Sequence, residues 1–144
     1  MIFMYAFYRA SSAGDKNPIM LASAAILATV ILLALAGFQL ALVAGVPLGH
    51  FAWGGQQRVL PVILRIFSLF AILMYALIAS ILLQKAALFS FWPESWIGIG
   101  IWIMTGYLAL GIPLNAMSRS RPEQLVMTPA ATILTILFLI VALS

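Results

Sequence analysis

Four long apolar runs, each almost free of charge, constrain this chain more than any other feature. They cover about residues 19–46, 60–83, 96–114 and 128–143. A helix of about 20 apolar residues crosses the roughly 30 Å hydrocarbon core of a bilayer. The runs therefore predict an all-α fold, an integral membrane four-helix bundle that forms a single transmembrane domain over residues 1–144.

The charge content supports a membrane protein and excludes several function classes. Only 7% of the residues are charged and 65% are hydrophobic, whereas a soluble domain has about 25% and roughly 45–50%. The chain has no cysteine, one histidine and three acidic residues, which rules out thiol chemistry and leaves little material for a metal site or cofactor. The seven basic residues lie between apolar runs, a pattern typical of membrane flanks and not of a nucleic-acid binder.

Proline and polar residues mark the predicted ends of the spans. Pro61 and Pro129 are expected in the first turns of the second and fourth helices, where the missing N–H costs nothing. Pro47 and Pro113 are expected to end the first and third. Asn17 is a candidate N-cap for the first.

Two aromatic stretches are expected at the membrane interface, where amphipathic rings are enriched. One is the short apolar stretch over residues 2–8, IFMYAFY. The other is the loop over residues 85–95, whose aromatic residues and the neighbouring Trp96 predict an aromatic belt at one membrane face.

A weak internal repeat relates the two halves of the chain. The sequence GVPLG at 45–49 is similar to GIPLN at 111–115, and 111 minus 45 gives an offset of 66 residues. The similarity suggests two parallel-repeated helical hairpins, although Gly, Pro and Leu also recur by chance at membrane helix ends. Either origin places the hairpin loops 47–59 and 115–127 at the same membrane face.

That face collects most of the polar side chains and is our candidate binding site. The second and fourth helices both begin there, so the positive ends of their dipoles favour an anion. We expect an anion or a lipid head group to bind among the following residues: His50, Trp53, Gln57, Arg58, Arg65, Asn115, Arg119, Arg121 and Glu123.

Two features of this face have alternative interpretations. Arg65 follows Arg58 by two helical turns, about 10 Å deeper. It either snorkels back to loop carbonyls or to Glu123, or forms with Arg58 the floor of an anion pocket. The loop sequence GHFAWGGQQR is either a compact turn anchored by Trp53 or a ligand lid.

The pattern GVPLGHFAWGGQQRVLP, with the later NAMSRSRPEQ, resembles an uncharacterised family of small bacterial integral membrane proteins. The resemblance implies a bacterial origin and carries no activity. The segment SRSRPEQ is similar to the cytoplasmic flank of an inner-membrane protein, so we expect the protein in the bacterial inner membrane. Four basic residues are expected at the loop face, and three, Arg9, Lys16 and Lys85, at the opposite face. This small excess slightly favours cytoplasmic loops.

Three hypotheses about function remain open on the sequence alone. The first is a non-enzymatic protein that binds anionic membrane lipids at the arginine-lined face. The alternative is an oligomeric small transporter or channel, with a second copy or another membrane protein as partner. The third is a membrane enzyme that uses His50 and Glu123.

Overall fold

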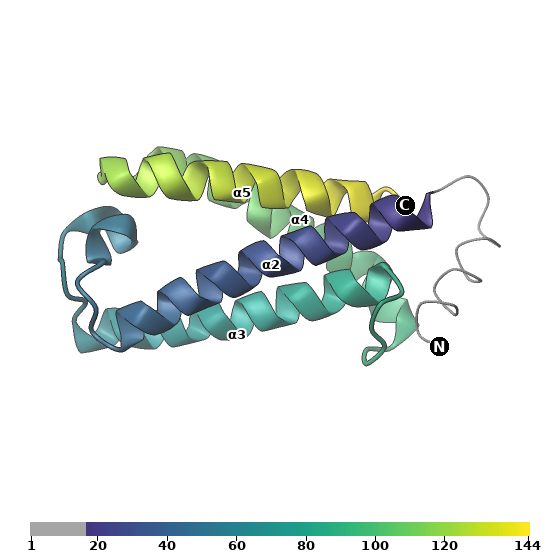
Figure 1. Cartoon of the computed structure of the whole chain (residues 1–144), viewed down its shortest axis with the longest axis horizontal. Coiled ribbons are helices and arrows are strands. Elements are labelled where there is room, and N and C mark those ends of the chain that lie inside the picture. Colours follow the sequence, from purple (N-terminus) through teal and green to yellow (C-terminus); the bar gives the residue numbers. More distant parts are fainter. Residues whose placement is uncertain (1–16) are drawn as a thin grey trace.

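The computed structural model describes residues 17–144, and within them four long helices account for most of the chain. Each is long and apolar enough to cross a membrane. This confirms the all-α four-helix bundle, whereas the predicted interfacial stretch at residues 2–8 lies outside the described residues. The helices are α2 (Pro18–Val43), α3 (Val62–Lys85), α4 (Glu94–Ala116) and α5 (Arg121–Ala142) (Figure 1).

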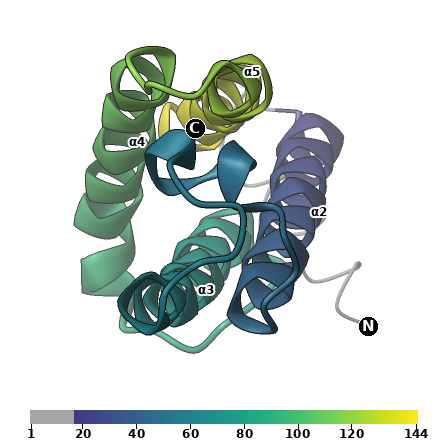
Figure 2. The same ribbon diagram turned by 90° about the vertical axis from the view of Figure 1, so that its left-hand side faces the viewer.

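The helices run up and down as two antiparallel hairpins, α2 with α3 and α4 with α5. The connection between α2 and α3 contains two short 3₁₀ turns, η1 (Gly49–Phe51) and η2 (Trp53–Gly55). These turns lie across the end of the bundle, with the four helices arranged around them (Figure 2). We call residues 44–61 the capping loop and this end of the bundle the capped end.

The helices pack most tightly at the other end. The main core joins the first half of α2 to the second half of α5 through small residues such as Ala25 and Ala28 against Phe138 and Val141. Toward the capped end α2 and α5 diverge (Figure 1). There the capping loop supplies its own apolar residues, because Ala52 and Leu60 form a second buried cluster with Leu42 of α2.

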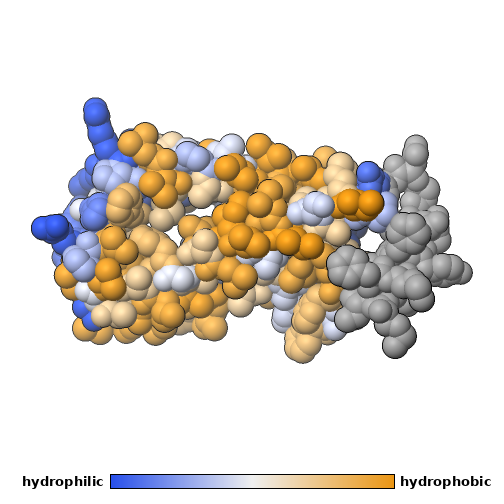
Figure 3. All heavy atoms as spheres, in the orientation of Figure 1, coloured by the Kyte–Doolittle hydropathy of each residue, from blue (hydrophilic) through white to orange (hydrophobic). Residues whose placement is uncertain are grey.

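Most of the remaining helix surface is apolar and faces outward. Only 22% of the residues in the apolar windows of α2, α3 and α4 are buried, as expected where lipid is the solvent. Figure 3 shows hydrophobic residues along the length of the bundle and hydrophilic ones gathered at the capped end.

Several predicted helix ends were wrong, while the Asn17 cap is confirmed. The Asn17 Oδ1 accepts the Ile19 N–H at 3.1 Å. Helix α5 begins at Arg121 and not near residue 128, so Pro129 lies inside it. Pro113 likewise lies inside α4 and does not end it. Helices in a membrane tolerate proline because neighbouring groups satisfy the freed carbonyls.

The revised ends alter the internal repeat and the second hairpin loop. Gly45, at a φ of +88°, lies in the turn that ends α2, whereas the matching Gly111 lies inside α4. The predicted loop 115–127 shrinks to residues 117–120, because a proline in the first turn allows α5 to start early. The two hairpins therefore share their topology but not the local structure of the matched residues.

Candidate functional site

The capping loop is a compact turn closed by its own backbone. The Gly49 N–H donates to the Arg58 carbonyl at 2.9 Å, so the two ends of the turn meet. A Cβ atom at Gly49 would lie 2.0 Å from the Gln57 carbonyl oxygen. Only glycine allows the two ends of the loop to approach this closely.

Glu123 attaches this loop to the start of α5. Its Oε2 accepts the Gly54 N–H at 3.0 Å and also the Ser118 hydroxyl. Beside it, the Ser120 hydroxyl donates to the His50 carbonyl. Glu123 is only 8% exposed, and a buried carboxylate needs such donors. The acid that we expected at this face therefore serves the fold by holding the loop against the helix.

Trp53 attaches the loop to α3. Its indole Nε1 donates to the Ser68 Oγ at 3.3 Å, and Ser68 is fully buried. The indole also lies 5.9 Å from the Phe67 ring, measured between centroids. Trp53 has a φ of 54°, a conformation that L residues rarely adopt, and this places its side chain on α3.

Arg65 binds the base of the same loop. Its Nε donates to the Leu60 carbonyl at 2.8 Å, which matches the expected contact with a loop carbonyl. The guanidinium lies against Gly45, where a Cβ atom would be 3.2 Å from Nη2. Glu123 binds Gly54 and Ser118 instead, and within residues 17–144 no ion pair joins it to Arg65.

The other three arginines are exposed around the docked loop. Arg58 lies in the capping loop, Arg119 in the short α4–α5 connection and Arg121 in the first turn of α5. Among the described residues at this end, Glu123 is the one carboxylate, and it is buried beneath the loop. The outer surface of the capped end is therefore basic.

His50, Gln57 and Asn115 are the remaining predicted site residues at this end. His50 is half-buried, with its ring 4.1 Å from that of Phe51. Gln57 is exposed, and Asn115 accepts the Ser118 N–H at 3.1 Å through its carbonyl in the last turn of α4. The two hydrogen bonds of Glu123 among the described residues go to Gly54 and Ser118 and do not involve the His50 ring.

Two sets of polar contacts were not predicted. Ser118 and Ser120 help to dock the capping loop, and Ser120 with Glu123 has the spacing of a capping box. However, neither side chain makes the capping-box bond: Ser120 donates to the His50 carbonyl, and Glu123 accepts from Ser118. At the opposite end, the buried Gln84 accepts the Phe91 and Trp92 N–H groups at 3.0 and 2.7 Å. The only sequence signal for this contact is a lone glutamine at the end of an apolar run.

The interior holds one further polar pair. Gln39 is 8% exposed and its side chain lies near that of Tyr75, while its Oε1 has no partner among the described residues. The described part of the chain contains no cluster of three or more His, Cys, Asp or Glu side chains that could hold a metal ion.

Comparisons with protein-family models, with curated proteins and with solved structures find no match to this chain. The resemblance to small bacterial membrane proteins accordingly stays a prediction.

Proposed function

We propose that this protein is a non-enzymatic membrane protein whose capped end binds the anionic head groups of membrane lipids. The observation that carries the proposal is the set of three exposed arginines around the capping loop, together with the burial of Glu123, the carboxylate of α5 that holds this loop. Their charge is available to an outside partner, because Glu123 is already bonded within the fold. Arginine pairs with phosphate through two parallel hydrogen bonds, which suits a lipid head group at the interface.

The helix ends add to this preference for an anion. Helices α3 and α5 both begin at the capped end, and neither has a side-chain hydrogen bond at its N-cap residue, Pro61 or Ser120. Their first N–H groups carry the positive ends of the helix dipoles. Two such ends and three arginines at one face support binding of a phosphate-bearing lipid.

A charge-removal experiment tests the proposal. The triple variant Arg58→Gln, Arg119→Gln, Arg121→Gln is compared with Lys16→Gln, which removes a basic residue that the sequence predicts at the opposite membrane face. Each basic residue near an anionic surface is worth about 1 kcal/mol, so the triple variant should bind phosphatidylglycerol about 100-fold more weakly at low salt. Binding is measured by titrating phosphatidylglycerol into each purified protein, with phosphatidylcholine as the neutral comparison.

Lys16→Gln should stay within about twofold of the wild type, because a charge at the opposite membrane face is roughly 30 Å from the loop face, well beyond the screening length in salt. If the folded triple variant binds phosphatidylglycerol as tightly as Lys16→Gln does, the arginines do not form the site.

We also place the protein in a bacterial inner membrane with the capped end on the cytoplasmic side. The support is the excess of basic residues at that end and the resemblance noted above. Because the chain has no cysteine, a single Gln56→Cys variant can report the side. An impermeant maleimide should label it in inverted vesicles and not in intact cells, and the opposite result would reverse the orientation.

A further inference from the structure

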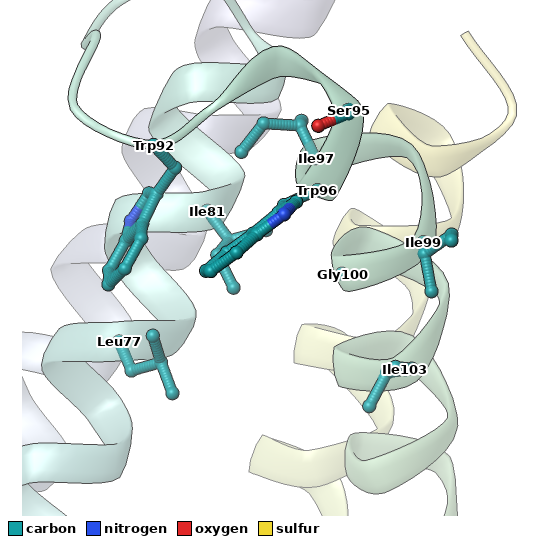
Figure 4. Close-up of a pocket in the computed structure, with 9 residues that line it drawn as sticks. All are labelled: Leu77, Ile81, Trp92, Ser95, Trp96, Ile97, Ile99, Gly100 and Ile103. Carbon is teal, nitrogen blue, oxygen red and sulfur yellow. The ribbon is translucent and has the colours of Figure 1, made fainter.

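An apolar cleft of about 370 Å³ lies between α3 and α4 at the end of the bundle away from the cap. Leu77 and Ile81 of α3 form one wall. Trp96, Gly100 and Ile103 belong to the facing side of α4, and Trp92 of the connecting loop lies beside α3 (Figure 4). The lining is almost entirely hydrocarbon and aromatic ring.

Side-chain hydrogen bonds hold the rim of this cleft in place. Gln84 bonds both the N–H and the carbonyl of Trp92, at 2.7 and 2.6 Å. The Trp92 indole Nε1 then donates to the Ser80 Oγ at 3.0 Å. Trp92 is therefore fixed on α3. On the other side, Trp96 is 63% exposed at the start of α4. Tryptophan side chains are enriched at the membrane interface, which places this rim near the head groups.

We propose that this cleft binds one acyl chain of a membrane phospholipid. From Trp96 to Ile103 the cleft follows α4 for seven residues, about 10 Å from the interface into the hydrocarbon layer. An apolar slot of this kind loses its dispersion contacts when it stays empty, and the solvent outside it consists of acyl chains. The proposal is independent of the lipid head-group site at the capped end.

Charge and access from the lipid both favour a single phospholipid chain over a second protein helix. Lys85 follows Ile81 by four residues, one turn farther on the same face of α3, where a lipid phosphate would lie. The cleft opens at the exposed side of α4, where Ile99 is 68% and Ile103 59% exposed, so an acyl chain can enter it directly from the bilayer.

Tryptophan quenching by a phospholipid with brominated acyl chains tests the proposal. The protein contains four tryptophans. A cleft reporter keeps Trp92 and Trp96 and carries Trp53→Phe and Trp102→Phe. A surface reporter keeps only Trp102, which is 49% exposed on α4 and senses ordinary surrounding lipid. In micelles of a neutral detergent mixed with increasing amounts of the brominated phospholipid, the cleft reporter should reach half-maximal quenching at an at least threefold lower fraction of brominated lipid.

Matched glycine variants on α4 test the cleft in the cleft reporter. Gly100→Leu places a side chain in the cleft, starting from a Cβ at an ordinary 3.5 Å from Ile81, whereas Gly106→Leu adds the same group where nothing lies within 4 Å. The threefold preference should disappear in Gly100→Leu and persist in Gly106→Leu. Ile103→Phe, at a position 59% exposed, adds a larger side chain to the cleft from farther along α4 without adding a tryptophan, and should act as Gly100→Leu does if the latter fails to fold.

Equal quenching of the two reporters would overturn the proposal, as would a preference that survives both filling variants. A preference that depends on the protein-to-lipid ratio at constant lipid composition would instead assign the cleft to a second copy of the chain, and the acyl-chain proposal would fail.

Discussion

Gly49→Ala is expected to displace the capping loop and to lower the free energy of unfolding by about 3 kcal/mol, the upper part of the usual cost of overpacking. The added Cβ would lie 2.0 Å from the Gln57 carbonyl oxygen and 3.0 Å from that of Arg58. Both are backbone atoms and cannot rotate away as a side chain could. The strands must separate, which breaks the Gly49–Arg58 hydrogen bond. Thermal unfolding in detergent and proteolysis of the loop measure the effect.

Gly54→Ala provides the matched control within the same loop. Gly54 has a φ of +80°, but a Cβ there meets nothing within 4 Å. This variant therefore carries only backbone strain, about 1 kcal/mol, and keeps the N–H that Glu123 accepts. If Gly49→Ala is no less stable than Gly54→Ala, the close approach of the loop strands does not hold the cap together.

The spans could be predicted from the sequence because membrane insertion depends on a local property. Twenty apolar residues in a row form a helix in lipid whatever lies elsewhere in the chain. The start of α5 does not follow from the apolar pattern, because Arg121 and its polar neighbours lie outside the apolar run. A helix does not end where the hydrocarbon layer ends, and Pro122 followed by Glu123 suits a first helical turn.

The contacts at the candidate site could be predicted only in part, because they are not local. Arginine in an apolar run must reach a polar partner, so the contact of Arg65 with the nearby Leu60 carbonyl was among the expected alternatives. The bond between Glu123 and Gly54 joins residues 69 apart. Nothing in either segment specifies the other, since a backbone N–H carries no sequence signature. The same reason hides the Ser120–His50 contact.

Glu123→Ala is expected to release the capping loop from α5. It leaves the Gly54 N–H and the Ser118 hydroxyl without their acceptor at a site where Glu123 is only 8% exposed. Hydrogen bonds to a charged group contribute about 1.5–3 kcal/mol each, so the loss should be about 3 kcal/mol. Glu123→Gln keeps one acceptor oxygen and should lose about half as much. Hydrogen exchange at the Gly54 amide reports the opening directly.

Leu125→Ala serves as the control, because Leu125 lies two residues farther along α5 and is 75% exposed. It should leave exchange at Gly54 unchanged. Fast exchange in Leu125→Ala, or slow exchange in Glu123→Ala, would show that the loop is held by other contacts.

Glu123→Gln also separates the structural role of this carboxylate from lipid binding. The variant removes a negative charge close to Arg119 and Arg121 while it loosens the loop. If the arginines bind phosphate as proposed, affinity for phosphatidylglycerol should rise about fivefold, the equivalent of about 1 kcal/mol for one charge. Stability and lipid affinity then change in opposite directions. A parallel fall in both would mean that the docked loop itself forms the binding surface, and that the arginines depend on Glu123 for their arrangement.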